Sequence, residues 1–274
     1  MAQWIGDLVG GGLGQALQVD DVLYDAVSPY QRIQVAVSPL FGRMLILDDA
    51  VQTTERDEYV YHEMLVHLPL VTHPDPTRVL IIGGGDGGTL EEVLKHPVAQ
   101  ATLVEIDRAV IDVSRAYLPG IANGAFDDPR ARVLIADGIA FVRETGERFD
   151  VVLVDSTDPK GAAEALFGEA FFALCARVLT ADGILCLQSG SLLYQRPLAA
   201  GMRTALERIF PLVLPYWAAV PAYPGTLWTF TVATRGPDPR TVARDAAARR
   251  TAAFGLRYYG PETHHAALAL PAVP

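Results

Sequence analysis

VLIIGGGDGG, residues 79–88, is a short apolar run that breaks into six residues, five of them glycine and one aspartate. The apolar run predicts a strand, the glycines predict a tight loop, and the following residues 89–96, TLEEVLKH, predict a helix. In such a unit the glycines permit backbone angles closed to other residues and let a ligand approach the main chain closely. The stretch therefore marks a ligand site.

The loop fits the GxGxxG pattern of nucleotide-binding proteins at Gly83, Gly85 and Gly88. Glu105 ends the next apolar strand. It follows the glycine loop by the ~20 residues at which this pattern places an acid that binds the ribose hydroxyls. Asp86 argues against NAD, because a loop that holds pyrophosphate offers N–H groups to an anion and a carboxylate would repel one. An adenosine with a positive centre, such as the sulfonium of S-adenosylmethionine, fits better. The alternative is that Asp86 only caps the following helix.

Composition limits the classes of protein that the chain can be. Its 274 residues allow one large α/β domain and a small appendage, and 50% hydrophobic with 20% charged residues is typical of a globular protein. A net charge of -10 argues against nucleic-acid or anionic-membrane partners and is compatible with a cationic substrate.

The chain carries no targeting signal that we can identify. No apolar run reaches the ~18 residues of a membrane helix, and residues 1–14 lack a basic segment and contain Asp7, unlike a signal peptide. Cys175 and Cys186 lie in apolar patterns and are expected to be core thiols, not a disulfide or a metal site. We therefore expect a cytoplasmic protein, with residues 1–14 as a loosely held arm.

The periodicity changes once along the chain. Residues 21–54 read as short strands with turns between them, too small a sheet to bury itself, and residues 55–70 read as a helix. From residue 79 strands and helices alternate, with helices expected at 163–179, 193–210 and 241–253 and a last strand at 227–234. This pattern predicts an α/β fold: a Rossmann-like, class I methyltransferase-like, mostly parallel sheet in residues 55–274, after a small N-terminal antiparallel β domain in residues 1–54.

Acidic residues recur where the predicted strands end. The strands are followed by Asp86, by Glu105 and Asp107, by Asp137, and by Asp155 and Asp158. Ligands of parallel sheets bind beyond the carboxyl ends of the strands. One rim of the sheet should therefore carry a negative field that attracts cations.

Together these motifs resemble the spermidine synthase (polyamine aminopropyltransferase) family, in its bacterial short form. The resemblance covers nearly the whole chain and is most specific in VQTTERDEYVYHEM and GGGDGG, with VEID, VDSTDP, PAYP and RYYGPETHHAALALP in support. It implies transfer of an aminopropyl group from decarboxylated S-adenosylmethionine to putrescine, which gives spermidine and methylthioadenosine. It also implies no metal or other cofactor, and a homodimer or homotetramer.

The resemblance assigns roles to residues. Asp155 matches the catalytic aspartate and Tyr61 the tyrosine that orients the attacking nitrogen. The residues implied for the donor nucleoside are Gln31, Gly83, Gly85, Asp86, Glu105, Asp137, Gly138 and Ala162. Those implied for the amine are His62, Asp86, Asp155, Asp158, Gln188 and Tyr223, with the distal ammonium on Asp158.

This chemistry suits the residue types. A primary ammonium has a pKa near 10, so forming the free amine at pH 7 costs about 4 to 5 kcal/mol unless a base accepts the proton. Asp155 would be that base. The leaving group is a neutral thioether, so the remaining rate would come from holding amine, carbon and sulfur in line. Asp86 would favour a donor that brings an ammonium over one that also brings a carboxylate.

Each of several assignments has a structural alternative. The alternatives are helix packing for Tyr61, an edge-strand polar residue for Gln31, a turn residue for Asp158, and loop packing for Tyr223. The six histidines are scattered and form no HExxH motif, so a metal site is not expected, and His264 and His265 are expected at the surface.

The chain departs from the family pattern in two places. Ala162 stands where proline is usual after DSTDP, in the segment that the family uses as a flexible gate, and Ala222 replaces the threonine of PTYP. Three other functions remain open: an S-adenosylmethionine-dependent diamine N-methyltransferase, a non-catalytic polyamine-binding paralogue, and a dehydrogenase, which Asp86 opposes.

Overall fold

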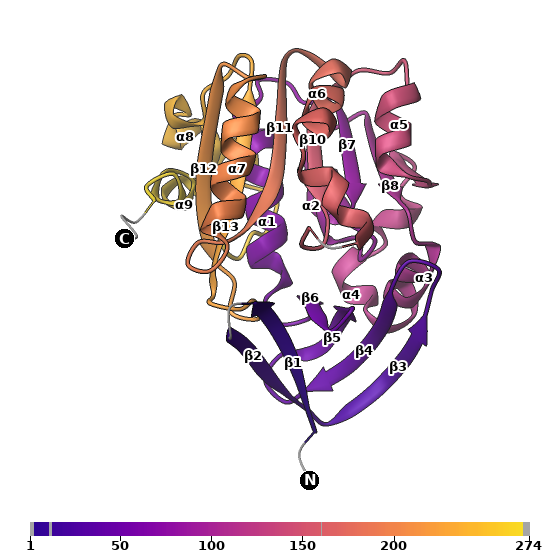
Figure 1. Cartoon of the computed structure of the whole chain (residues 1–274). Helices are drawn as coiled ribbons and strands as arrows, with labels where there is room; N and C mark the ends of the chain where they lie inside the picture. The colour runs from indigo at the N-terminus through magenta and orange to yellow at the C-terminus, as the bar shows by residue number, and fades with distance from the viewer. Residues whose placement is uncertain (1–2, 11–12, 160, 271–274) are drawn as a thin grey trace.

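The large sheet of this computed structural model contains seven strands in the order β12-β13-β11-β10-β7-β8-β9 (Figure 1). The structure describes residues 3–10, 13–159 and 161–270. The strands are β7 (Arg78–Gly83), β8 (Gln100–Glu105), β9 (Ala131–Ile135), β10 (Phe149–Asp155), β11 (Leu179–Ser191), β12 (Leu212–Ala219) and β13 (Leu227–Thr234). β13 runs antiparallel to both neighbours, and the other pairings are parallel. The expected mostly parallel sheet is confirmed.

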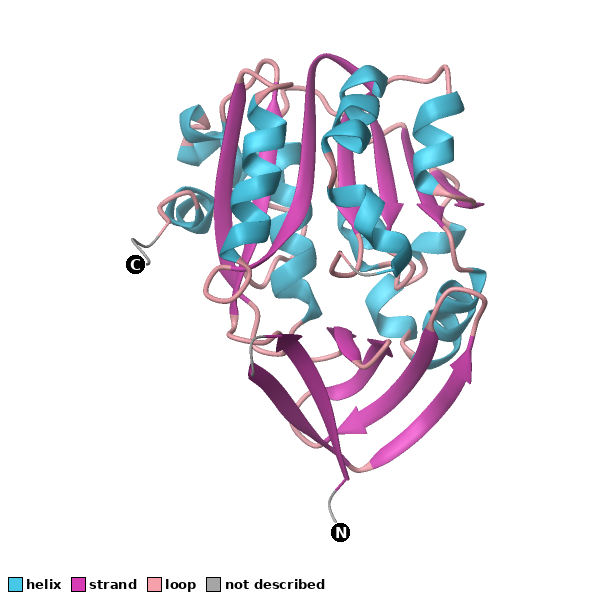
Figure 2. Ribbon diagram, viewed as in Figure 1, coloured by secondary structure: helices cyan, strands magenta, loops and turns pink. Residues whose placement is uncertain are grey.

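Helices cover both faces of this sheet, as Figure 2 shows. Successive side chains of a strand point to opposite faces. Ile81 accordingly packs in the core shared with α1 (Glu58–Thr72) and α2 (Gly88–Lys95). Its neighbour Ile82 packs in the core shared with α5 (Gly138–Glu144), α6 (Glu169–Val178) and α7 (Arg196–Glu207). The near-continuous apolar strands are thus explained by burial on two sides.

The N-terminal residues form a second, antiparallel layer that lies below the large sheet in Figure 1. Its four strands are β3 (Asp21–Val27), β4 (Arg32–Ser38), β5 (Gly42–Leu47) and β6 (Ala50–Thr54). Ile33 and Leu45 of this sheet pack against Val110 of α3 (Arg108–Tyr117) and Ile121 of α4 (Pro119–Ala122). The prediction that the small sheet depends on another part of the chain for burial is confirmed.

The expectation of a loosely held arm in residues 1–14 is wrong for the part that the structure describes. β1 (Gln3–Gly10) pairs antiparallel with β2 (Leu13–Val19). The Asp7 side chain of β1 accepts a hydrogen bond from the Val51 N–H at 3.2 Å, and the Gln15 side chain of β2 donates one to the Ala222 carbonyl at 3.1 Å. Tertiary contacts therefore order a stretch whose glycines gave no periodicity.

Two other elements differ from expectation. Strand β12 has no counterpart in the sequence analysis. It contains Pro215, which is tolerated because β12 is an edge strand. The helix expected at 163–179 is split at Gly168 into the 3₁₀ segment η2 (Gly161–Phe167) and α6. The expected thiols, Cys175 and Cys186, are both buried and free.

The C-terminal segment packs on the outside of the large sheet. The remaining helical segments are η1 (Ala125–Asp127), η3 (Pro239–Thr241), α8 (Arg244–Thr251) and α9 (Pro261–Ala267). His264 is fully buried, unlike the surface position expected, because its ring contacts the Tyr259 hydroxyl at 2.7 Å and the Pro239 carbonyl at 2.8 Å. Within the described ranges no helix is both long and apolar enough to cross a bilayer.

Candidate active site

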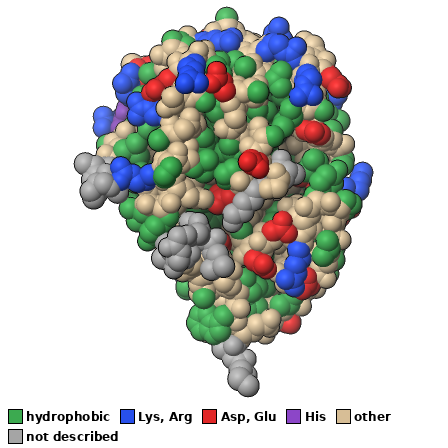
Figure 3. Space-filling model, in the orientation of Figure 1, with side chains coloured by type: hydrophobic (Ala, Val, Ile, Leu, Met, Phe, Trp, Pro, Cys, Tyr) green, Lys and Arg blue, Asp and Glu red, His purple; other side chains and the backbone are tan. Residues whose placement is uncertain are grey.

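A cavity of about 530 Å³ opens at the carboxyl ends of β7, β8 and β10, between the large sheet and the N-terminal strands. Figure 3 shows acidic side chains around the middle of this face, while lysine and arginine side chains gather toward its upper edge. The sequence-predicted site residues that line the cavity are Gln31, Tyr61, Gly83, Gly85, Asp86, Glu105, Asp137, Gly138, Asp155, Asp158, Gln188 and Tyr223. The predicted acidic rim therefore surrounds one cavity.

Two predicted residues stand apart from that set. His62 is not among the described residues that line the cavity; it lies behind Asp86. The side chain of Ala162 lies outside the described part of the chain, although the backbone there belongs to η2.

The glycine loop passes very close to the end of β10. Gly83 has φ +84°, and a Cβ there would lie 2.0 Å from the Asp155 carbonyl oxygen. The Gly84 N–H donates a hydrogen bond to that same carbonyl at 2.8 Å. Only glycine fits this position, so the loop brings Asp86 and Asp155 to one place.

Two hydroxyl groups hold the Asp155 carboxylate. The Tyr61 phenol donates to Oδ1 at 2.9 Å and the Thr89 hydroxyl donates to Oδ2 at 2.6 Å. Burial, with the nearby charge of Asp86, raises the pKa of Asp155 above the usual aspartate value. Burial and Asp155 also raise the pKa of Tyr61 well above 10, so the phenol remains a proton donor.

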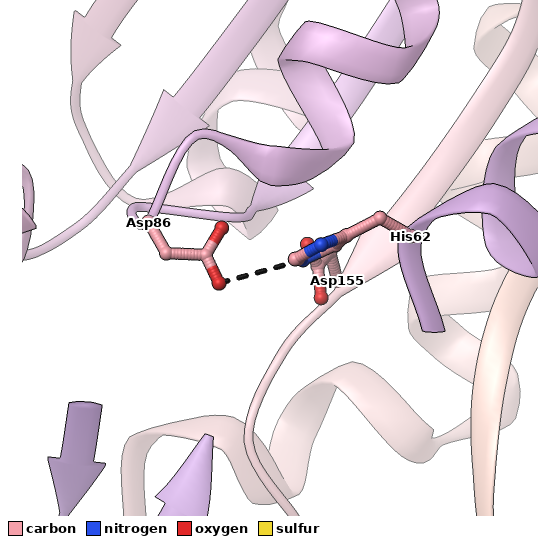
Figure 4. A group of neighbouring side chains, drawn as sticks. All are labelled: His62, Asp86 and Asp155. Carbon is pink, nitrogen blue, oxygen red and sulfur yellow. Dashed lines mark ion pairs between the residues drawn. The ribbon is translucent and has the colours of Figure 1, made fainter. Parts of the chain in front are cut away.

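Asp86 both caps a helix and faces a charge partner. Its Oδ1 accepts a hydrogen bond from the Gly88 N–H at 2.9 Å, at the start of α2, and its Oδ2 lies 3.4 Å from His62 Nε2. His62 Nδ1 lies 2.9 Å from Glu58 Oε2. Figure 4 shows His62 and Asp86 pointing toward one another beside Asp155. Asp86 therefore contacts both the start of α2 and a charge partner inside the protein.

The charges of this pair support each other. Burial alone would lower the pKa of His62, but Asp86 and Glu58 outweigh it and raise that pKa well above 6.5. Burial likewise opposes ionisation of Asp86, but the imidazolium outweighs it and lowers the pKa of Asp86. At neutral pH the pair is therefore an imidazolium beside a carboxylate.

One ligand atom each from His62, Asp86 and Asp155 lie within 4.8 Å of one another, a spacing that a metal ion could use. The sequence pattern predicts no such cluster, because the three residues come from separate elements. Both ring nitrogens of His62 already contact carboxylates. The two aspartates equally suit an ammonium group, which is a cation that donates hydrogen bonds to oxygen.

The end of the cavity nearest β8 is built around Glu105. Its Oε1 accepts from the Asp107 N–H at 2.8 Å, and burial raises its pKa to about 7. Asp107, which also caps α3, accepts hydrogen bonds from Ser28 at 2.6 Å and from the Gln31 side chain at 3.1 Å. Gln31 is therefore positioned by an acid that the sequence places at the same rim.

Asp137 and Gly138 form the next part of the wall. Asp137 Oδ1 accepts from the Ile139 N–H at 2.7 Å and caps α5. A Cβ on Gly138 would lie 2.5 Å from Ile82 Cγ2, so the first turn of α5 packs directly on β7. A side chain at Gly138 would therefore collide with Ile82.

The other end of the cavity holds Asp158, Gln188 and Tyr223. Gln188 donates to the Ser156 carbonyl at 3.3 Å, and the Tyr223 phenol donates to the Gln52 carbonyl at 2.5 Å. Tyr223 also contacts the Tyr61 ring, at a centroid distance of 5.7 Å. Gln188 and Tyr223 are thus fixed by contacts with other residues of the cavity wall.

Three further side chains at the site have no signal in the sequence pattern: Thr89, Gln195 and Trp228. The buried indole nitrogen of Trp228 has no hydrogen-bond partner among the described residues. Gln195 donates to Asp158 Oδ2 at 2.7 Å. Thr89 directly follows the glycine loop, but nothing in the sequence indicates its contact with Asp155 or the positions of the other two side chains.

Comparison with known proteins gives the family. The spermine/spermidine synthase domain matches residues 58–242, and the spermidine synthase tetramerisation domain matches residues 3–55. The chain belongs to the spermine/spermidine synthase family. The second match supports an oligomeric assembly for this family member.

Relatives and solved structures of the family match over nearly the whole chain. A polyamine aminopropyltransferase of Desulforudis audaxviator is 45% identical, covering 99% of this chain and 97% of the relative, and one of a Ruegeria species is 44% identical, covering 98% and 95%. A spermidine synthase in complex with the transition-state analogue AdoDATO has a TM-score of 0.94 and 38% identity, covering 98% of this chain and 92% of that one. The spermidine synthase of Thermotoga maritima has a TM-score of 0.91 and 37% identity, covering 98% of this chain and 91% of that one.

Proposed function

We propose that this member of the spermine/spermidine synthase family transfers an aminopropyl group from decarboxylated S-adenosylmethionine to putrescine, giving spermidine and methylthioadenosine. The observation that carries the proposal is the Asp155 carboxylate, held by Tyr61 and Thr89 beside Asp86 at the end of β10. The names of the relatives and the likeness to a structure with a transition-state analogue support it.

The donor nucleoside would lie along the loop and the rim of β8 and β9. Glu105 would accept hydrogen bonds from the ribose hydroxyls, with Gln31 on the same side. Asp137 and Gly138 would face the adenine. Gly83 and Gly85 keep the loop free of side chains where the donor passes.

Asp86 would bind the aminopropyl ammonium of the donor. The ordinary methyl donor carries a carboxylate near this position as well, and Asp86 would repel that charge. His62 has both ring nitrogens on carboxylates, so we assign it to hold Asp86 in place, not to contact the diamine. Asp86 is thereby kept ionised and oriented.

Asp155 would accept the proton of the attacking amine. Its raised pKa makes it a better base than an ordinary aspartate, and Tyr61 and Thr89 fix its direction. The amine lone pair forms a bond to the methylene carbon next to sulfur as the carbon–sulfur bond breaks. The electron pair of that bond remains on sulfur, which leaves as a neutral thioether, and the proton passes to Asp155.

The rest of the diamine would extend toward Asp158. That carboxylate would bind the distal ammonium, with Gln188 and Tyr223 along the path. No metal enters this scheme, because every charge that changes is met by a side chain already present.

Assembly and domain roles complete the proposal. Residues 1–54 would form the assembly domain and residues 55–274 the catalytic domain, in a cytoplasmic homodimer or homotetramer. The match of residues 3–55 to a tetramerisation domain supports this division. Light scattering on the purified protein measures the oligomer directly.

The test of function is a product assay by mass spectrometry. The purified protein is given putrescine with decarboxylated S-adenosylmethionine and, separately, with S-adenosylmethionine itself. We expect spermidine and methylthioadenosine from the first mixture alone. N-methylputrescine from the second would make the chain a methyltransferase, and amine binding without any product would make it a binding protein.

A further inference from the structure

The side chain of Gln195, the residue before α7, bridges two segments of the acceptor end of the cavity. Its Nε2 donates to Asp158 Oδ2 at 2.7 Å, and its Oε1 accepts from the Ser191 N–H at 2.7 Å. Gln195 itself lines the cavity beside Asp158. The loop after β10 is thus tied to the end of β11.

Chemistry fixes the direction of this amide. An ionised carboxylate only accepts hydrogen bonds and a backbone N–H only donates them. The Gln195 nitrogen must therefore face Asp158, and its oxygen must face Ser191. Because the amide is neutral, it orients Asp158 without adding a positive charge of its own.

A glycine makes room for the bridge. Gly190 has φ +79°, and a Cβ there would lie 2.5 Å from Gln195 Oε1 and 3.2 Å from Gln195 Cβ. Its N–H donates to Gln188 Oε1 at 2.8 Å, and its carbonyl accepts from the Thr229 hydroxyl at 2.7 Å. The Gly190 backbone is therefore fixed so that its Cα, which carries no side chain, lies against the Gln195 amide.

We propose that Gln195 is a positioning residue that sets the direction of the Asp158 carboxylate and so determines affinity for the amine acceptor and selectivity for its length. This inference rests on the proposed function, in which Asp158 binds the distal ammonium. A carboxylate that is already oriented loses less rotational freedom when the ammonium binds. A fixed carboxylate also defines one distance from Asp155, and hence one preferred spacing between the two amines.

The experiment compares Q195A and Q195E with the wild-type enzyme and with R203A, whose arginine makes a surface ion pair on the same helix α7. For Q195A we expect KM for putrescine to rise about tenfold, the size of a lost hydrogen bond to a charged group. The kcat and the KM for the donor stay within about twofold, because Asp155 and the donor side are untouched. R203A behaves as wild type.

Two further readouts separate positioning from a general structural effect. Q195A should lose part of the preference for putrescine over 1,3-diaminopropane and cadaverine. Q195E places a carboxylate, which only accepts hydrogen bonds, against Asp158, so it cannot orient Asp158 and should lose the length preference as Q195A does. G190A should displace the amide and reproduce Q195A, and the double variant should be no worse than either single variant.

The outcomes are decisive even if the proposed function fails. An unchanged putrescine KM and length preference in Q195A, or equal rises of donor and acceptor KM, would overturn the inference. If the wild-type enzyme makes no spermidine, calorimetric binding of putrescine in the presence of methylthioadenosine takes the place of KM. Weaker binding to Q195A would then retain the role of Gln195 and reject only the transfer reaction; equal or absent binding would reject it.

Discussion

The Tyr61 phenol donates a 2.9 Å hydrogen bond to Asp155 Oδ1 across 94 positions of sequence. Helix α1 lies over β10 and β11, so a tyrosine in its first turns reaches the carboxyl end of β10. Thr89, at the start of α2, holds the other oxygen. The Asp155 carboxylate is therefore oriented by residues of two helices.

Replacing Asp155 by asparagine should remove turnover and leave the fold intact. The amide keeps the shape and can still receive the Tyr61 hydrogen bond, but it does not accept a proton from the amine. We expect kcat to fall by about 10² to 10⁴-fold while methylthioadenosine binds as in the wild type. Calorimetry and single-turnover kinetics measure the two properties, and a near-normal rate would remove Asp155 from the mechanism.

Replacing Tyr61 by phenylalanine tests orientation without removing the base. The ring contacts with Tyr223 and Phe230 remain, and only the hydroxyl is lost. We expect kcat to fall about tenfold, the range of one hydrogen bond to a charged group. Thr89→Val is the matched variant at the other oxygen, and full activity in both would show that the orientation of Asp155 does not limit the rate.

Nucleoside binding should depend on pH through Glu105. Burial raises the pKa of Glu105 to about 7, and ribose hydroxyls that donate to its carboxylate would favour the ionised form. Binding then releases a proton below pH 7, so affinity rises with pH. We expect methylthioadenosine to bind about tenfold more weakly at pH 6 than at pH 8.

The control for this effect is Glu105→Gln. Its amide does not titrate, so its affinity should be lower and independent of pH. Calorimetry in two buffers of different ionisation enthalpy also counts the released proton directly. A wild-type affinity that does not change between pH 6 and 8 would show that Glu105 is not the group that contacts the ribose.

The parts of the fold and the site that could be predicted from the sequence are those whose residues are close together in the chain. The apolar strands and the glycine loop have a periodicity that reflects burial on two faces, and parallel strands bring their carboxyl ends together by topology. That reasoning suffices to predict the sheet and to gather Asp86, Glu105, Asp137, Asp155 and Asp158 at one cavity.

Other parts of the site depend on contacts between distant segments. Thr89 and Gln195 are ordinary polar residues in the sequence, and their hydrogen-bond partners at the site lie 66 and 37 positions away. His264 is followed by a second histidine, His265, which suggests an exposed polar segment, yet tertiary packing buries His264 against Tyr259. No local pattern encodes such partners.

Asp86 should determine which donor is used. Replacing it by asparagine removes the negative charge that favours an ammonium and repels a carboxylate. We expect KM for the decarboxylated donor to rise about tenfold and inhibition by S-adenosylmethionine to strengthen. His62→Gln is the companion variant, because it keeps Asp86 but removes its cation. Competition between the two donors, followed by mass spectrometry, measures the effect; unchanged discrimination in D86N would contradict the role of Asp86.

A buried pair of histidines should make stability depend on pH. His67, on α1, lies with Nδ1 2.9 Å from His96 Nε2 and with Nε2 2.9 Å from Glu92 Oε2. If both imidazole rings are neutral, the hydrogen bonds among His67, His96 and Glu92 are all formed: His67 Nε2–H donates to Glu92 and His67 Nδ1 accepts from His96. A second proton on His67 would point at the His96 N–H, and Phe254 packs against both rings. The folded chain therefore resists protonation of the pair.

Burial lowers the pKa of His67 to about 3, and burial with His67 lowers that of His96. Since the unfolded chain binds these protons below about pH 6.5 and the folded chain does not, this stabilisation is complete above pH 6.5 and is lost as pH falls toward the folded values. Each histidine contributes to the free energy of unfolding a slope of about 1.4 kcal/mol per pH unit in that window.

The experiment compares variants, because Glu105 changes the free energy of unfolding in the opposite direction between its unfolded pKa and its folded pKa of about 7. Urea unfolding from pH 5.5 to 8 should show a smaller loss of unfolding free energy on acidification in His67→Gln than in the wild type, and His265→Gln should match the wild type. Equal slopes in all three proteins would mean that the pair accepts a proton without unfolding.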